Sequence, residues 1–428
     1  MLNLSYPGIY TRELASGLKV VTNAPTSVAC FVGPTIAGID NRATRIFGFP
    51  DFERAFGGLS QTSNLSYSVK HFFANRGGET SAIRVPSKGA AAAESTLVRD
   101  VALSTAAFVI TSLSSGIASN NIFVEIDDLD IGTKPFSVAP NDLIFNLSVQ
   151  DRLTGRSERF GGITTDSASA RFAPNVINEP ATGSKFIKLT MGAGSPGKPA
   201  PQATGSYYTI GAPPVGRAAF AKDVHAMLTV EFRDDDATGA VDAINAISLD
   251  ATVFHSGEAT PATPLELVGR MTAALNAALH ADAGASAKMQ GLALEGGLSK
   301  GGTIYRLRIA PVGTTVTSGR RADGRVTIAD IGGGAAGTML LTEMKLVELR
   351  SNPSRYQLGA AYKTAQVNAQ TVGKDGDVTG QPDSNVFKAA VMALGDPDPF
   401  FNLLCLPDAV RPSSLDPAAP FHANLNDI

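Results

Sequence analysis

The sequence has 428 residues, a formal net charge of −3 and two cysteines. Apolar residues make up 43% and charged residues 18% of the chain, which excludes a mainly disordered protein. The charge balance provides no general field for nucleic acid or an anionic membrane, and two cysteines are too few for a disulfide framework. At about 150 residues per domain, the length suits about three domains.

Residues 1–23 predict an extended arm. Pro7 restricts such a segment to an edge or an extended conformation. The segment is too apolar for a solvated tail, with apolar side chains at Tyr6, Ile9, Tyr10, Leu14, Leu18, Val20 and Val21. It does not resemble a signal peptide, because proline and charge come too early. No apolar run approaches the ~18 residues of a membrane span, so we expect no membrane insertion.

Residues 24–100 predict the first part of an α/β core. We predict a strand over residues 27–33 and a short helix over 50–56 that ends at two glycines. A second helix is expected to begin at Ser63 or Asn64 and to end near residue 77, and a strand to follow over 81–86. This order of strands and helices is typical of an α/β fold.

Residues 101–336 predict one or two β-rich insertion domains. Short β-like runs alternate with turn clusters, and the runs are 106–113, 121–127, 143–151, 186–191, 207–211, 227–232 and 304–311. One amphipathic helix is expected near 264–281.

Residues 337–428 predict a return to the α/β core, incomplete at its C-terminal end. We expect a helical stretch over 338–349, a polar loop over 372–383, a helix over 385–395 and a strand over 399–410. The last twenty residues are rich in Pro, Ser, Ala and Asn and predict a loop.

Two short motifs resemble catalytic signatures. Residues 192–198 fit the phosphate-binding pattern GxxxxGK, but Pro199 stands where the metal-binding Ser or Thr should follow. Residues 297–301 fit the nucleophile-elbow pattern GxSxG around Ser299, but a strand-like run follows instead of a helix. We interpret the first as a hairpin loop and the second as a β-turn, so no catalytic or cofactor-binding residue is predicted.

The remaining reactive residues predict no metal site and no nucleic-acid platform. The five histidines have no metal-ligand spacing, and the acidic clusters at 127–130, 234–236 and 375–377 are interpreted as solvated turns. Cys30 and Cys405 lie in apolar runs and predict two buried thiols on core strands. The phenylalanine pairs at 72–73 and 400–401 are interpreted as core residues. Basic residues are thinly spread and not interleaved with aromatic residues.

Several segments, in order, resemble the tail sheath proteins of contractile phages and related contractile injection systems. In the first hundred residues they are YPGIY at 6–10, TSVACFVGPT at 26–35, FPDFERAFGG at 49–58, FFANRGG at 72–78 and IRV at 83–85. The later ones are Asn352-Pro353, Tyr356, Leu358, Asp375-Gly376 and FNLLCLP at 401–407. The order and spacing of these segments make the resemblance specific, and it covers about 40% of the chain.

The resemblance implies a discontinuous α/β core, subtilisin-like by fold and not by activity, interrupted by β-rich domains. It implies a structural subunit that forms hexameric rings in a helical sheath around an inner tube protein and contracts to drive the tube through a target envelope. Baseplate and tail-terminator proteins would be further partners. Assembly would take place in the bacterial cytoplasm, and the mature product would be a virion tail or an injection particle.

The resemblance also implies that the N-terminal arm pairs with strands of neighbouring subunits. The arm residues expected to make these contacts are Tyr6, Pro7, Gly8, Ile9, Tyr10 and Leu14. Family members continue beyond the last strand seen here, so we expect the 428 residues to be an incomplete form.

Two alternatives stay open. One is a non-sheath virion or baseplate structural protein. The less favoured one is a hydrolase that uses Ser299 or the glycine-rich loop at 192–198.

Overall fold

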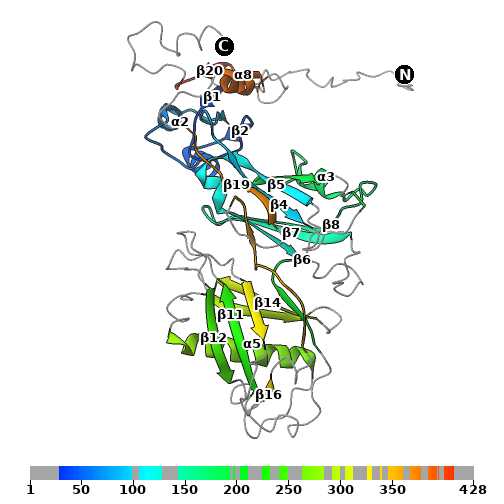
Figure 1. Cartoon of the computed structure of the whole chain (residues 1–428). Helices are drawn as coiled ribbons and strands as arrows, with labels where there is room; N and C mark the ends of the chain where they lie inside the picture. The colour runs from blue at the N-terminus through cyan, green and yellow to red at the C-terminus, as the bar shows by residue number, and fades with distance from the viewer. Residues whose placement is uncertain are drawn as a thin grey trace, which may run out of the picture.

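The computed structural model contains three consecutive packing units, each with its own apolar core (Figure 1). It describes residues 28–98, 106–127, 143–192, 196–197, 203–210, 224–231, 241–248, 263–283, 292–298, 304–311, 325–329, 338–339, 346–359, 367–376, 384–392, 394 and 400–408. The described strands form five sheets of four strands each. None of the described helices is both long and apolar enough to cross a bilayer.

The first unit, the α/β unit, is built on the sheet β2-β3-β1-β20. In it β1 (Ala29–Gly33) runs parallel to β3 (Thr80–Arg84) and to β20 (Leu403–Cys405), whereas β2 (Ala43–Ile46) is antiparallel to β3. Parallel strands are normally covered on both faces, which explains why β1 is apolar at every position. The predicted strand over 27–33 is therefore confirmed as a fully buried strand.

Helices cover both faces of this sheet. Ala29 and Phe31 pack against α1 (Phe49–Phe56) and α2 (Asn64–Ala74). Cys30 and Val32 alternate to the other face and pack with Phe387 of α8 (Ser384–Met392). Gly57 ends α1 in the left-handed region, at φ 85, which a side chain would strain. The predicted helices at 50–56, 63–77 and 385–395 are thus confirmed within a few residues.

The second unit is a β-sandwich. One sheet has the order β19-β4-β5-β9 and the other β18-β6-β7-β8. Their inner faces share one core that includes Phe108, Phe145 and Leu189. The bounds are β4 (Ala92–Val98), β5 (Ala106–Ser115), β6 (Ile122–Asp127), β7 (Ile144–Asp151), β8 (Ser157–Thr164), β9 (Ile187–Met191), β18 (Tyr356–Gln357) and β19 (Val367–Thr371). The short helix α3 (Ala173–Ile177) and the 3₁₀ turn η1 (Ile117–Asn121) complete the unit.

The third unit, the α+β unit, contains the sheets β13-β14-β10-β17 and β12-β11-β15, with β16 beside β11. The bounds are β10 (Ser206–Thr209), β11 (Val224–Glu231), β12 (Val241–Ser248), β13 (Leu292–Leu298), β14 (Ile304–Pro311), β15 (Arg325–Ala329), β16 (Thr338–Met339) and β17 (Val347–Ser351). Helix α5 (Pro264–Ala281) buries Met271 and Leu275 in the core of this unit.

The start of α5 follows from its sequence. The Thr263 hydroxyl accepts a hydrogen bond from the Glu266 amide at 3.2 Å, and Pro264 occupies the first turn. The helix expected near 264–281 is therefore confirmed with these bounds.

The helix predicted over 338–349 is wrong at both ends of that stretch. Residues 338–339 form β16 and residues 347–351 form β17, while 340–345 lie outside the described residues. Leu346, just before β17, is buried, Val347 at the start of β17 is exposed, and the strand pairs with β10. Pairing with an existing sheet outweighs the local helical pattern.

The chain returns through the units in reverse order. After the α+β unit, the segment from 346 onward adds β17, then β18, then β19 and finally β20. Each of these four strands lies at an edge of its sheet. The returning chain therefore completes, one after another, the sheets that the outgoing chain began.

We predict that core truncation in α5 destabilises the protein. Leu275 is fully buried, so Leu275→Ala should lower the free energy of unfolding by about 2–5 kcal/mol. Leu265, in the same helix, is 66% exposed, and Leu265→Ala should change it by less than about 0.5 kcal/mol. Urea unfolding followed by circular dichroism measures both. Equal losses would contradict the packing of α5.

Candidate interaction surface

Among the described strands, the sheet of the α/β unit ends at β20, and β20 carries no charged side chain. The strand sequence is Leu403-Leu404-Cys405, and among the described strands only β1 pairs with it. Leu403 and Leu404 are exposed, as are Phe400 before the strand and Met392 at the end of α8. An uncharged apolar edge with unpaired main-chain groups is a template for an added strand.

The opposite edge of the same sheet is protected. On β2, Arg45 forms an ion pair with Glu79, with a distance of 2.7 Å between Arg45 Nε and Glu79 Oε1. Charged side chains at an edge disfavour pairing with another strand. Of the two edges, β20 is therefore the one suited to accept a further strand.

Asp408 holds β20 and the segment after it against α2. Its carboxylate accepts hydrogen bonds from the amides of Asn64 at 2.8 Å and Leu65 at 3.0 Å. These are amides of the first turn of α2, where the helix has no internal partners for them and favours a negative charge. The Ser63 side chain makes no capping hydrogen bond and donates instead to the carbonyl of Pro34 at 2.5 Å. The predicted start of α2 is confirmed, but its cap comes from a residue 344 positions away.

The two cysteines lie on neighbouring strands but on opposite faces of the sheet. Cys405 pairs in register with Phe31 and packs on the face covered by α1 and α2, whereas Cys30 faces α8. Burial, with a smaller effect of Cys405, raises the pKa of the Cys30 thiol to about 12. Both thiols are free, so the expectation of two thiols on core strands is confirmed, with Cys405 only partly buried.

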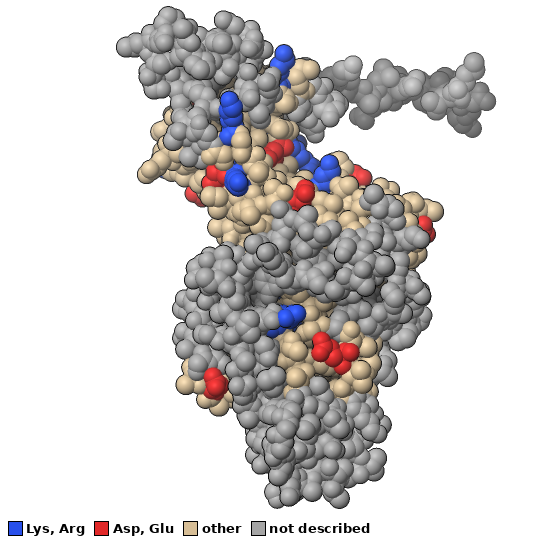
Figure 2. All heavy atoms as spheres, in the orientation of Figure 1, with Lys and Arg blue, Asp and Glu red and all other residues tan. Residues whose placement is uncertain are grey.

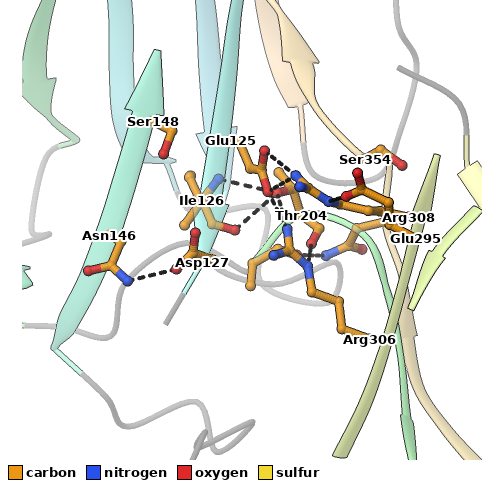
Figure 3. A network of polar contacts seen from close by, with 12 residues as sticks. Glu125, Ile126, Asp127, Asn146, Ser148, Thr204, Glu295, Arg306, Arg308 and Ser354 are labelled. Atoms are coloured by element: carbon orange, nitrogen blue, oxygen red, sulfur yellow. Dashed lines mark hydrogen bonds and ion pairs between the residues drawn. The ribbon is translucent and has the colours of Figure 1, made fainter. Parts of the chain in front are cut away.

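A network of charges joins the β-sandwich to the α+β unit. Figure 3 shows Arg306 and Arg308 of β14 converging on Glu125 of β6. Both guanidinium groups lie 2.6 Å from a Glu125 carboxylate oxygen. Burial opposes the charged form of Arg306, but Tyr207 and the Glu125 carboxylate hold its pKa above the ordinary value.

Thr204 adds main-chain contacts to this junction. Its amide donates to the Ile126 carbonyl at 2.8 Å, and its own carbonyl accepts from Arg306 Nε at 3.2 Å. The junction therefore combines a main-chain hydrogen bond with partly buried ion pairs, which restricts how the two units are oriented.

Asp127 corrects the interpretation of the first acidic cluster as a solvated turn. Its side chain is buried at the end of β6, where it accepts hydrogen bonds from Asn146 at 2.7 Å and from Arg159. Asp375 likewise accepts from the Ile117 amide at 2.7 Å. Asp234–236 lie outside the described residues. Within the described ranges, no group of three or more His, Cys, Asp or Glu side chains is placed to hold a metal ion.

The two catalytic-like motifs fall in connections between strands. The chain passes from β13 to β14, which pair antiparallel with Leu298 opposite Tyr305, so the Ser299 loop closes a hairpin and not a strand–helix elbow. Ser299 itself lies outside the described residues. The hairpin expected at 192–198 is wrong, because β9 pairs with β5 and β10 pairs with β14 and β17.

Other predicted site residues have separate outcomes. All the arm residues, Tyr6, Pro7, Gly8, Ile9, Tyr10 and Leu14, lie outside the described residues, so their role stays a prediction. Phe72 and Phe73 pack on the core of the α/β unit, but Phe400 is exposed, which corrects its assignment to the core. Sequence reasoning missed Asp408, Glu125 and Arg306. The one sequence signal for the charged junction was the alternation of Arg306 and Arg308 with apolar residues in β14.

Comparisons with known proteins give structural neighbours only. No protein-family model matches the chain, and no curated protein matches it. Among solved structures, a sheath tail protein from Listeria innocua is similar over 42% of this chain and 33% of that chain, with 14% identity and a TM-score of 0.26. A sheath tail protein from Desulfitobacterium hafniense is similar over 46% and 37%, with 11% identity and a TM-score of 0.23. The matches thus span about a third of those two proteins.

We predict that the Asp408 cap stabilises the α/β unit. Asp408→Ala leaves two amides of α2 without their acceptor and should lower the free energy of unfolding by about 1–2 kcal/mol. Asp408→Asn keeps one acceptor oxygen and should cost less. Urea unfolding measures both variants, with amide hydrogen exchange at Asn64 and Leu65 as the local readout. Unchanged exchange in Asp408→Ala would contradict the cap.

Proposed function

We propose that this chain is a structural subunit of a contractile tail sheath. The observation that carries the proposal is the convergence of the two resembling blocks. The first block lies within residues 6–85 and supplies β1, β3, α1 and α2, and the second includes 401–407 and supplies β20. About 300 residues separate them in sequence, yet β1 and β20 pair in register. A resemblance by chance would not be expected to select segments that meet in one sheet.

The edge of β20 supports a role in assembly. A subunit that adds a strand to one site of its neighbour makes a heterologous contact, which generates an open helical polymer. The apolar N-terminal arm over residues 1–23 is the proposed donor, and the uncharged β20 edge is the proposed acceptor. Strand addition would supply main-chain hydrogen bonds between the two subunits.

The domain organisation proposed from sequence joins the arm (1–23) to a split α/β core (24–100 and 337–428) around a β-rich part (101–336). The sheets place β4, β18 and β19 in the β-sandwich and β17 in the α+β unit, so the α/β core is confined to shorter segments at both ends of the described chain. In the assembled sheath, hexameric rings would surround an inner tube, and contraction would move subunits largely as rigid bodies. The partly buried charge junction around Glu125 supports rigid movement of the β-sandwich with the α+β unit.

A structural role is favoured over a hydrolase by one observation, the hairpin at Ser299. The nucleophile elbow of a GxSxG motif needs a strand–helix turn, and the antiparallel pairing of β13 with β14 does not fit one. The non-sheath virion or baseplate protein stays as the second candidate, since it would share the fold but not the helical polymer.

Electron microscopy of the purified protein tests the proposal. We expect tubes or stacked rings with a hollow lumen, and removal of residues 1–20 should abolish them. Circular dichroism and the unfolding transition of the shortened chain should stay as in the wild type, because the arm is proposed to pair with a neighbouring subunit and not with its own chain. Dispersed particles in every condition would contradict the sheath proposal. Tubes that persist without residues 1–20 would contradict the role of the arm.

A further inference from the structure

A cleft of about 750 Å³ lies between the α/β unit and the β-sandwich. One wall comes from the segment between β1 and β2 and from α1, and the other from the end of β7 and the segment before β9. Its volume is within the range of sites that hold small ligands. None of the residues discussed above as an assembly edge lines it.

The lining of the cleft is cationic, although the chain as a whole has a net charge of −3. The acidic lining residues are Glu53 and Asp151, and the basic ones are Arg42, Arg45, Arg54, Arg156 and Lys185. Arg45 and Arg54 have acidic partners, Glu79 and Asp51. The contacts that the structure describes for the side chains of Arg42, Arg156 and Lys185 are all with neutral groups. In Figure 2, Lys and Arg side chains are exposed on the α/β unit and where it meets the β-sandwich, with a few Asp and Glu side chains among them.

Two of these cations share one neutral acceptor. Arg42 Nη2 lies 2.6 Å from the Pro180 carbonyl oxygen, and Lys185 Nζ lies 2.9 Å from the same oxygen. Lys185 also donates to the Ala181 carbonyl at 3.1 Å. Two like charges held beside one dipole repel each other, and an anion between them would relieve the repulsion. Arg156 adds a third positive charge, stacked over the Phe186 ring at 5.2 Å.

Apolar side chains accompany the charge. Ile36 and Leu153 line the cleft from opposite walls and are 42% and 59% exposed. A free small anion would leave these side chains in water, whereas a peptide with alternating acidic and apolar residues would cover them. A nucleic acid would need aromatic platforms and a longer run of phosphate contacts.

We propose that this cleft binds an extended acidic segment of a partner protein. Its carboxylates would pair with Arg42 and Lys185, and its apolar side chains would cover Ile36 and Leu153. The binding site bridges the α/β unit and the β-sandwich, so the bound segment would hold the two together. The proposal does not depend on the sheath function.

Fluorescence anisotropy with a designed probe tests the proposal. The probe is a fluorescein-labelled octapeptide of alternating Asp and Leu, and its control has Asn in place of Asp. The acidic peptide should bind the wild-type protein, should bind more weakly as NaCl is raised, and should bind at least tenfold more tightly than the neutral control.

Matched variants locate the site. Arg42→Gln combined with Lys185→Gln should weaken binding of the acidic peptide at least tenfold, whereas Lys388→Gln, on the exposed face of α8, should leave it unchanged. Matching unfolding midpoints confirm that the variants are folded. The proposal is overturned if neither peptide binds, if both bind equally, or if the double variant binds as the wild type does. The proposal would also be overturned if the double variant lost self-assembly but still bound the peptide. That result would assign the cleft to a contact between copies of this chain.

Discussion

The pairing of β1 with β20 is the constraint on which the remaining architecture depends. β1 is apolar on both faces and lies in the middle of its sheet, so it needs a neighbour on each side. One neighbour, β3, is local, but the other is supplied by residues 403–405. Asp408 then fixes the returning chain by accepting the first amides of α2. The α/β unit is therefore complete only after nearly all of the described chain has been added.

The same constraint explains the course of the chain through the other units. A chain that must return to β1 passes each unit twice, and each return segment is used as an edge strand. Main-chain groups that would otherwise be unpaired during the return are thus paired in sheets. The charged junction at Glu125 and the cleft at Arg42 lie where consecutive units meet, so both bear on how the units are held together.

The elements were predictable where local signals agree with the tertiary environment. Thr263-Pro264 at the start of α5 and the continuous apolar run of β1 are examples. The sequence alone does not indicate that Asp408 caps α2, since no local pattern links residues 344 positions apart. Asp127 was misassigned because an acidic cluster usually marks a solvated turn, whereas here Asn146 and Arg159 compensate its burial. The segment at 338–349 has a helical pattern, but sheet pairing decides the structure of its two described ends, 338–339 and 347–349.

The central functional claim is that the arm of one copy adds to the β20 edge of another, and site-specific cross-linking tests it directly. In a Cys405→Ser background, chains with Ile9→Cys are mixed with chains with Leu404→Cys and treated with a short bismaleimide. Cys30 should stay unreactive, because burial raises its thiol pKa to about 12. The account predicts linked dimers in the mixture and far fewer in either chain alone. Tubes that form without this cross-link, or equal cross-linking when Leu153→Cys replaces Leu404→Cys, would contradict it.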